Sequence, residues 1–425
     1  MAEQNVDAPL GALDWHVIDP ARWHALAEAH GTPLYLFDAD AVARRVRQVR
    51  EALGGEAGVY YAVKANPNLA LLRSMRGVVD GVDISSGGEL AQALLAGYDA
   101  ADMSFAGPGK TEDELHAAIA AGTGCISVES VREIDVCASI AARIGRRAQI
   151  LLRVNPTQVH RGFGLKMGGR ALQFGIDEDQ LPEAEALVRA HGHHLHCQGL
   201  HSYVGSQCFD TAGVLEATRN ALRLAQAFEA RTGWPCLKLN LGGGFGLAQS
   251  GERRELPLAE AAPALREMIG TFRNSRPQTK VFFELGRYIL AEAGVYVTRV
   301  VDCKVSRGSS YVVCDGGLNH QLAAAGTFGA ALRGNFPLLN LSRPSSTKVR
   351  CHVAGPSCNP TDLLGVQVEL PQAQPGDLLG VAMSGAYGLT ASPLLFLGHD
   401  TPAELVLQGG AIELGRRRRS MQEFN

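Results

Sequence analysis

The stretch VYYAVKANPNLALLRSMRGVVDGVDISSGGELAQALLAG at residues 59–97 decides the fold, because two short apolar segments alternate in it with two longer segments. The apolar segments VYYAVKA and GVDIS have the length and composition of buried strands. The segments NLALLRSMR and GGELAQALLAG are rich in Ala, Leu, Arg and Glu, as helices are. This alternation predicts βαβ units and therefore a parallel sheet.

The same alternation continues outward, from about residue 34 to about residue 285. Helix start signals support it: Asp38 and Asp40 precede one helical segment, and Thr111 with Glu114 has the spacing of a capping box. About eight such units predict a (β/α)8 TIM-type barrel rather than an open sheet. No GxGxxG follows the first strand, which argues against a dinucleotide-binding fold.

After about residue 290 the pattern changes to β-rich segments separated by Gly, Pro and Ser, with few helical windows. We therefore expect an α/β protein with two domains. A barrel spans residues 38–287, and a mostly antiparallel β-barrel or sandwich domain is formed by residues 1–37 and 288–425.

Composition excludes several classes of protein. The chain has 425 residues, 46% of them hydrophobic, and 40 Lys and Arg against 43 Asp and Glu give a net charge of −3, so no nucleic acid is expected as partner. The nine Cys show no CxxC pair, which indicates free thiols. With no signal peptide and no apolar run of ~18 residues, we expect a cytoplasmic protein without membrane contact. The basic run at 416–419 is expected to be a solvated tail.

Lys64 lies in VYYAVKANPN, where the Asn-Pro-Asn sequence breaks the strand after the lysine. In a barrel this position is at the carboxyl-terminal mouth, where active sites lie. Partial desolvation there would lower the pKa of the amine and favour reaction with a carbonyl group. The alternative is a lysine that only extends to solvent from a strand end.

Two further segments follow predicted strands. The glycine-rich run at 242–246 would let backbone N–H groups approach a phosphate, with Ser206 as a second donor, or it is simply a flexible loop. Glu284 and Arg287 in ELGRY would hold a protonated ring nitrogen and an anionic group, or form a structural ion pair.

Cys358 in VAGPSCNPTDLL has turn neighbours that can present a thiol, although a lone Cys is usually a small buried hydrophobe. Tyr387 in SGAYGL can reach a ligand or be held by a structural hydrogen bond.

His201 and Tyr203 are expected on one face of a strand, where an aromatic ring can stack on a planar cofactor. The four His of RAHGHHLHC lack matching ligands, so no metal site is expected.

Taken together, seven motifs occur in the order seen in the alanine-racemase-fold (fold type III) pyridoxal-phosphate-dependent decarboxylases, which include diaminopimelate, ornithine and arginine decarboxylases. The motifs are YAVKAN, DISSGGEL, HSYVGSQ, LNLGGGFG, ELGRY, GPSCNPTDLL and SGAYGL. The chain resembles this family from about residue 30 to about residue 410.

The resemblance implies pyridoxal 5'-phosphate as cofactor, held by Lys64, with Cys358 as a catalytic acid that reaches in from the partner subunit. It also implies a head-to-tail homodimer with shared active sites. By the same resemblance, Glu284 would bind the ring nitrogen. Ser206, Gly244, Arg287 and Tyr387 match phosphate or substrate contacts of the family. Further candidate contacts to the cofactor or substrate are Tyr203, Gly243 and Asn359.

Several departures from the family pattern bear on the substrate. Tyr203 stands where the family has a stacking His, and Leu285 stands where the lysine-pathway enzymes have Pro. Asn359 stands where diaminopimelate and ornithine enzymes carry an acid that pairs with a distal ammonium. The segment at 316–337 stands where diaminopimelate decarboxylases have a segment that contacts the distal end of the substrate. Within residues 316–337, Arg333 is a candidate contact for substrate carboxylates.

With the segments at 164–177 and 384–399, these departures resemble a side branch of the family. It contains decarboxylases of citrate-based siderophore pathways, an exosortase-associated group and an enzyme that acts on carrier-bound glutamate. The sequence therefore predicts a decarboxylase of an amino acid or conjugated amino acid, such as a citryl-amino acid. The alternatives are diaminopimelate decarboxylase, a fold type III racemase, and a non-enzymatic relative; Glu284 and Cys358 argue against a racemase.

Overall fold

The computed structural model describes residues 15, 18–159, 162–252, 254–326 and 334–425. They divide into two compact units. Unit 1 comprises residues 1–42, 249–252 and 289–425, and unit 2 comprises residues 43–248 and 253–288.

Unit 2 is built on eight parallel strands that pair in a closed ring, because β5 pairs with both β4 and β6. In ring order these strands are β2 (Gly58–Ala62), β3 (Gly81–Ile84), β4 (Met103–Phe105), β5 (Cys125–Val128), β6 (Ala148–Asn155), β9 (Leu195–His201), β11 (Lys238–Asn240) and β12 (Lys280–Leu285). The predicted TIM-type barrel is thus confirmed.

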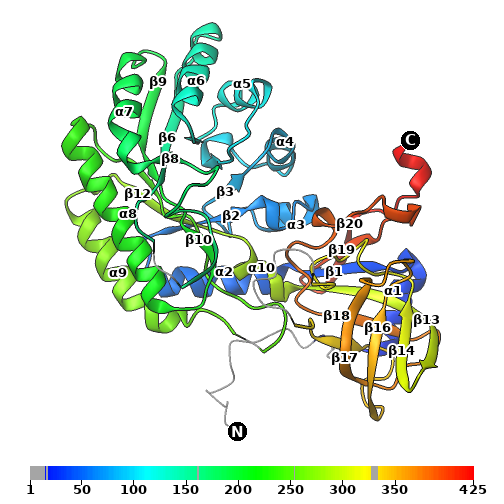
Figure 1. Ribbon diagram of the computed structural model, residues 1–425. Helices are drawn as coiled ribbons and strands as arrows, with labels where there is room; N and C mark the ends of the chain where they lie inside the picture. Colours follow the sequence, from blue (N-terminus) through cyan, green and yellow to red (C-terminus); the bar gives the residue numbers. More distant parts are fainter. Residues whose placement is uncertain (1–14, 16–17, 160–161, 253, 327–333) are drawn as a thin grey trace. The chain divides into compact units, whose positions relative to one another are not determined.

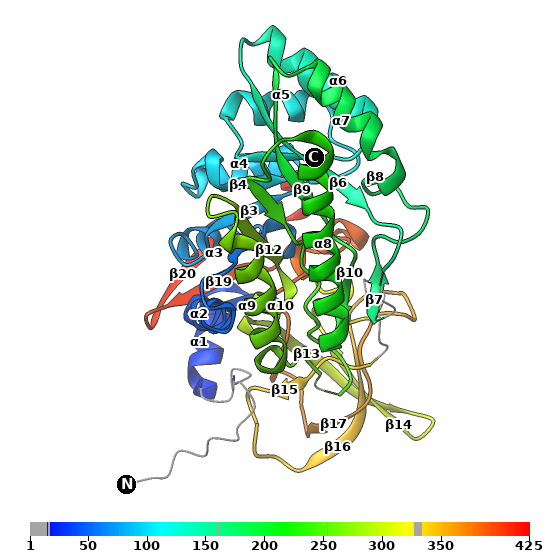
Figure 2. The same cartoon turned by 90° about the vertical axis from the view of Figure 1, so that its left-hand side faces the viewer.

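Helices surround this barrel (Figure 1). They are α2 (Ala39–Leu53), α3 (Leu69–Ser74), α4 (Gly87–Leu95), α5 (Glu112–Ala121), α6 (Val131–Arg143), α7 (Leu181–Ala190), α8 (Thr211–Thr232) and α9 (Leu258–Asn274). Figure 2 shows α8 and α9 side by side on the outer surface. Strands β7 (Phe163–Lys166) and β10 (Gly205–Cys208) form a separate two-stranded antiparallel sheet, and β8 (Ile176–Asp177) pairs with β6.

Local sequence sets the helix ends as expected. The Thr111 side chain accepts a hydrogen bond from the Glu114 N–H, and the Glu114 carboxylate accepts one from the Thr111 N–H, which completes the predicted capping box of α5. The Asp38 carboxylate accepts a hydrogen bond of 2.9 Å from the Ala41 N–H at the start of α2. These contacts satisfy backbone donors that the first helical turn leaves without partners.

Unit 1 is a mostly antiparallel sheet with two parallel pairings, β1 with β19 and β14 with β16. Its strands are β1 (Leu34–Asp38), β13 (Gly294–Ser306), β14 (Ser309–Cys314), β15 (Leu338–Asn340), β16 (Lys348–Ala354), β17 (Leu363–Pro371), β18 (Leu378–Val381), β19 (Ala403–Gln408) and β20 (Ala411–Arg416). Helix α1 (Pro20–His30) precedes β1, and the short helix α10 (Arg287–Leu290) precedes β13.

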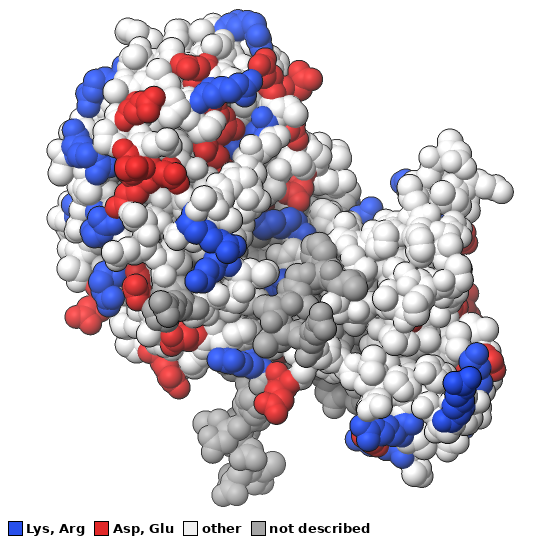
Figure 3. Space-filling view, viewed as in Figure 1, with Lys and Arg blue, Asp and Glu red and all other residues white. Residues whose placement is uncertain are grey.

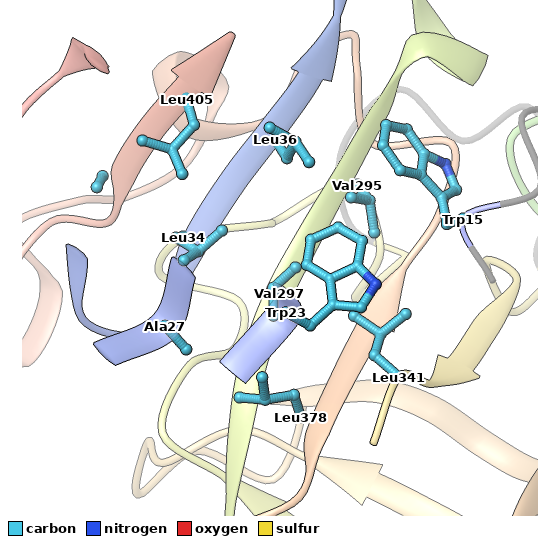
Figure 4. Packing of buried hydrophobic residues seen from close by; sticks show 11 residues of the cluster. Trp15, Trp23, Ala27, Leu34, Leu36, Val295, Val297, Leu341, Leu378 and Leu405 are labelled. Carbon is cyan, nitrogen blue, oxygen red and sulfur yellow. The ribbon is translucent and has the colours of Figure 1, made fainter. Parts of the chain in front are cut away.

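The core of unit 1 joins segments from both ends of the chain. Trp23 of α1 belongs to one buried cluster with Leu36 of β1, Val295 of β13 and Leu405 of β19 (Figure 4). Trp23 is 1% exposed, and burying one such aromatic side chain stabilises a fold by about 1.5–3 kcal/mol. This cluster explains why the amino-terminal segment belongs to the β-rich unit.

The expectation of a solvated basic tail is wrong. Arg416 is the last residue of β20 and pairs at 2.6 Å with the buried carboxylate of Glu404. The Arg418 guanidinium donates a hydrogen bond of 2.6 Å to the carbonyl of Thr32 and lies 3.4 Å from Asp400. The tail is therefore tied to the sheet by charge-assisted contacts.

Charges of both signs are interspersed over the face of the unit 2 barrel that Figure 3 shows. No described helix combines the length and the hydropathy that crossing a membrane requires.

Candidate active site

Lys64 lies just beyond the carboxyl-terminal end of a barrel strand. Strand β2 ends at Ala62, two residues earlier than predicted, and Lys64 sits in the 3-10 turn Val63–Ala65 that follows. Its Nζ is 3.5 Å from Oδ2 of Asp83, and its side chain is 41% exposed while that of Asp83 is fully buried. The amine thus projects from the barrel mouth with a carboxylate beside it.

Glu284 on β12 is the centre of a buried polar cluster. Its Oε1 accepts hydrogen bonds from Ser104 Oγ, at 3.1 Å, and from the Asn240 side-chain amide. Its Oε2 is 3.6 Å from Nε2 of His201, and the other ring nitrogen of His201 is 2.9 Å from Ser127 Oγ. The five side chains come from five strands of the barrel, which fixes the orientation of the Glu284 carboxylate.

Burial and neighbouring charges shift two pKa values in this cluster. Burial, followed by the Glu284 charge, raises the pKa of Asp83 well above its usual range, although Lys64 opposes this shift. Burial, followed by the positive charges of Arg153, Lys64 and Lys110, lowers the pKa of His201 well below its usual range. His201 is therefore neutral at pH 7. The carboxylates of Asp83 and Glu284 repel each other unless a cation or a proton lies between them.

The pKa of His201 leads to a stability prediction. The native state resists protonation of this ring while the unfolded chain binds the proton near pH 6.5, so stability falls as the pH drops below about 6.5. His201→Gln in the cofactor-free protein is expected to remove up to about 1.4 kcal/mol of that loss per pH unit. Urea unfolding at pH 5.0–7.5 measures it, with the exposed His193→Gln as control; an unchanged slope in His201→Gln would contradict the assignment.

The glycine-rich run after β11 is packed too closely for side chains. Gly244 has a φ of +93°, and a Cβ there would lie 2.1 Å from the carbonyl oxygen of Gly205. A Cβ on Gly243 would lie 1.9 Å from the carbonyl oxygen of Glu284. Only glycine allows the run to approach β10 and β12 so closely, which leaves a cradle of backbone groups at the barrel mouth.

Three other predicted residues surround the same mouth. The Tyr203 ring lies against Gly242, where a Cβ would be 2.7 Å from the ring atoms. Because β9 ends at His201, Tyr203 lies in the connection to β10 and not on the same strand as His201, which corrects that expectation. Ser206 lies on β10, whose Cys208 N–H donates a hydrogen bond of 2.8 Å to the Gly244 carbonyl.

Arg287 begins α10 directly after Gly286, and a Cβ on Gly286 would lie 2.9 Å from Cβ of Ala65. The ELGRY segment therefore packs against the turn that carries Lys64. The structure thus brings Lys64, Glu284 and Arg287 together with the glycine-rich run, Tyr203 and Ser206.

The remaining predicted residues belong to unit 1. Cys358 is exposed, and Asn359 is half-buried beside it. The Asn359 side-chain oxygen accepts hydrogen bonds from the Thr361 N–H, at 3.0 Å, and from the Thr361 hydroxyl, at 2.9 Å. Tyr387 is half-buried with a φ of +56°, which is uncommon for a residue with a side chain. Arg333 lies outside the described residues.

The histidine-rich segment is a turn before β9, where His191 pairs at 2.8 Å with Asp135. Within the described ranges, no group of three His, Cys, Asp or Glu side chains is arranged to hold a metal ion.

Sequence reasoning missed Asp83, Ser104 and Asn240 as members of the site, and it singled out His201 only as sharing a strand face with Tyr203. Each is a polar residue at or near the carboxyl-terminal end of a buried barrel strand. A polar side chain in such a strand has to find partners inside the barrel, and this signal was available in the sequence.

The comparisons with known proteins agree with this geometry. A family model described as pyridoxal-dependent decarboxylase, pyridoxal binding domain, matches residues 39–291. The chain belongs to the pyridoxal-dependent decarboxylases. It is therefore a pyridoxal-phosphate-dependent carboxy-lyase.

Relatives of this decarboxylase are named for different substrates. An L-glutamyl-[BtrI acyl-carrier protein] decarboxylase of Niallia circulans is 37% identical, over 94% of each chain. A diaminopimelate decarboxylase of Neisseria meningitidis is 34% identical, over 94% of this chain and 95% of the relative. The solved diaminopimelate decarboxylase of Helicobacter pylori, complexed with L-lysine, has a TM-score of 0.84 and 26% identity, covering 94% of this chain and 98% of its own.

The residues at the barrel mouth fit the cofactor that the family uses. Lys64 offers an accessible amine, and Glu284 offers a buried, fixed carboxylate suited to a protonated ring nitrogen. The glycine cradle that a Cβ would fill suits a phosphate group. When bound, pyridoxal phosphate supplies an electron sink for the bond that breaks at Cα.

Proposed function

We propose that this decarboxylase removes the α-carboxylate of an amino acid whose distal end is conjugated and is neutral or anionic. A citryl-amino acid of siderophore biosynthesis and a carrier-bound glutamate are examples of such a substrate. The Cα–carboxylate bond breaks, carbon dioxide leaves, and a proton is added at Cα to give the amine.

Asn359 carries this proposal. A carboxylate at its position would compensate a distal substrate ammonium, but Asn359 has no charge and its oxygen already accepts two hydrogen bonds from Thr361. A buried ammonium without a compensating charge costs several kcal/mol. The similarity to the carrier-protein decarboxylase supports the same reading.

Specific roles follow for the other residues. Lys64 would hold the cofactor and exchange it with the substrate amine, and Glu284 would keep a proton at the ring nitrogen. Gly243, Gly244 and Ser206 would bind the phosphate, and Tyr203 would lie against the ring. Arg287, Tyr387 and Arg333 would orient the substrate. Cys358 would deliver the proton to Cα.

We further infer a head-to-tail homodimer in which Cys358 of one subunit completes the site of the other. Its exposure in the single chain is compatible with this role. The nine unpaired cysteines favour a reducing compartment, so we infer a cytoplasmic enzyme.

A panel of carbon-dioxide release assays tests the substrate proposal. We expect citryl-serine, citryl-diaminopropionate or carrier-bound glutamate to give a kcat/KM at least about tenfold above those of meso-diaminopimelate, lysine and ornithine, since tenfold corresponds to ~1.4 kcal/mol of binding. Asn359→Asp should shift the preference towards the diamino acids, with Asn274→Asp, at the exposed end of α9, as a control. If meso-diaminopimelate gave the highest value, the enzyme would be a diaminopimelate decarboxylase and the proposal would fail.

A further inference from the structure

A second cavity lies at the amino-terminal edge of the barrel, away from Lys64. Its volume is about 820 Å³, within the range of small-molecule sites. It lies between the end of α2, the end of α9 and the first residues of β2 and β12. The residues that matter for its chemistry are Arg50, Tyr60, Asp80, Asp102, Lys280 and Phe282.

Two stacked aromatic rings line the inner part of this cavity. The rings of Tyr60 and Phe282 are 4.2 Å apart at 23°, and they form one layer inside the barrel with Cys125 and Leu151. Gly81 leaves room for Tyr60, because a Cβ there would be 2.6 Å from the end of the ring. Tyr60 is only 7% exposed, and its hydroxyl has no hydrogen-bond partner among the described residues. The hydroxyl of this largely buried side chain lines the cavity, where it can donate or accept a hydrogen bond with a polar ligand.

The charges around the Tyr60 hydroxyl are negative. After burial, the groups that raise its pKa are Cys125 and then three carboxylates, Asp102, Asp80 and Glu284. Of the cations that line the cavity, Arg50 is already paired with Asp80 at 2.5 Å, and Arg273 with Glu56 at 3.0 Å. Lys280 is exposed at the rim, as Asp102 is. The potential at the aromatic floor therefore favours a cation over an anion.

We propose that this cavity binds the ammonium group of a small primary alkylamine. Asp102 supplies the charge, the Tyr60 hydroxyl accepts a hydrogen bond, and the two rings cover the alkyl chain and attract the cation. The inference concerns a small amine without carboxylates, so it does not extend to the conjugated product of the proposed function.

The rings that line the cavity lie close in the barrel to Glu284, the carboxylate suited to the cofactor ring nitrogen. Phe282 precedes Glu284 by two residues on β12, so both face the barrel interior, and Tyr60 is the residue opposite Glu284 in the pairing of β12 with β2. A ligand that shifts these rings shifts the layer beneath Glu284. The cavity is therefore placed to let a small amine act on the enzyme from the amino-terminal end of the barrel.

Calorimetric titration of the borohydride-reduced holoenzyme with butylamine tests this site, because the cofactor is then locked on its lysine. We expect one equivalent to bind, and we expect Asp102→Asn to weaken binding about tenfold. Tyr60→Phe keeps the ring and should weaken binding several-fold. Glu112→Gln, an exposed carboxylate on α5, should leave it unchanged.

Butyrate is the probe of opposite charge and is expected not to bind. The fluorescence of the reduced cofactor is expected to change with butylamine in the wild type and not in Asp102→Asn. Absence of butylamine binding, equal binding by Asp102→Asn, or equal binding of butyrate would each overturn the inference. None of these results depends on turnover, so they are distinguishable from a failure of the proposed substrate.

Discussion

Lys64→Ala is expected to lose the visible absorbance of the bound cofactor and at least about 10³-fold in kcat/KM, since residues that act as one catalytic unit lose nearly all activity when one member is removed. The Lys64 amine projects from the turn after β2, beside the buried Asp83, and Glu284 lies on β12, the strand that pairs with β2. An alanine there leaves the cofactor no covalent attachment. Absorbance spectra before and after borohydride reduction, followed by mass measurement of the intact protein, check the prediction.

Lys304→Ala is the matched control, because Lys304 is an exposed lysine on β13 in unit 1. It should keep the absorbance, the mass increase after reduction and the activity. A reducible adduct that persisted in Lys64→Ala would assign the attachment to another lysine. Loss of the adduct with an unchanged circular dichroism spectrum would separate the chemical role of Lys64 from a folding defect.

The barrel could be predicted because its signals are local. Each strand and helix of unit 2 has a characteristic residue composition. The start of a helix is signalled within four residues, as in the capping box from Thr111 to Glu114. The β-rich character of unit 1 was visible for the same reason. The parallel pairing of β1 with β19 was not, because it joins residues 34–38 to residues 403–407, and no local pattern records such a partner.

The candidate site was predictable only in part. Motif residues such as Lys64 and Glu284 were found, but the side chains that hold Glu284 in place were not. Asn240 ends β11, which pairs with β12, and His201 ends β9, which pairs with β11. Their role depends on register across strands distant in sequence. The end of β9 at His201 also shows that strand ends are less certain than strand existence.

Cys358→Ala is expected to keep the cofactor absorbance and to lose about 10²–10⁴-fold in turnover, which is the range for removing a positioned proton donor. The thiol is exposed, and the loop that carries it is fixed by the buried Asp362, whose carboxylate accepts hydrogen bonds from the Ser357 N–H, at 2.9 Å, and the Leu318 N–H, at 2.6 Å. Cys303→Ala, which removes the other exposed thiol, is the control and should remain active.

Mixing two inactive variants then tests whether sites are shared between subunits. In a dimer of Lys64→Ala with Cys358→Ala, one of the two sites would combine an intact Lys64 with an intact Cys358 contributed by the other chain. Random reassociation would give half of the dimers this composition, so about a quarter of the wild-type activity is expected to return. Mixing after mild dissociation, with activity measured against each variant alone, gives the answer. If no activity returned although mixed dimers were shown to form, Cys358 would act within its own chain or only in packing, and the proposed shared site would be wrong.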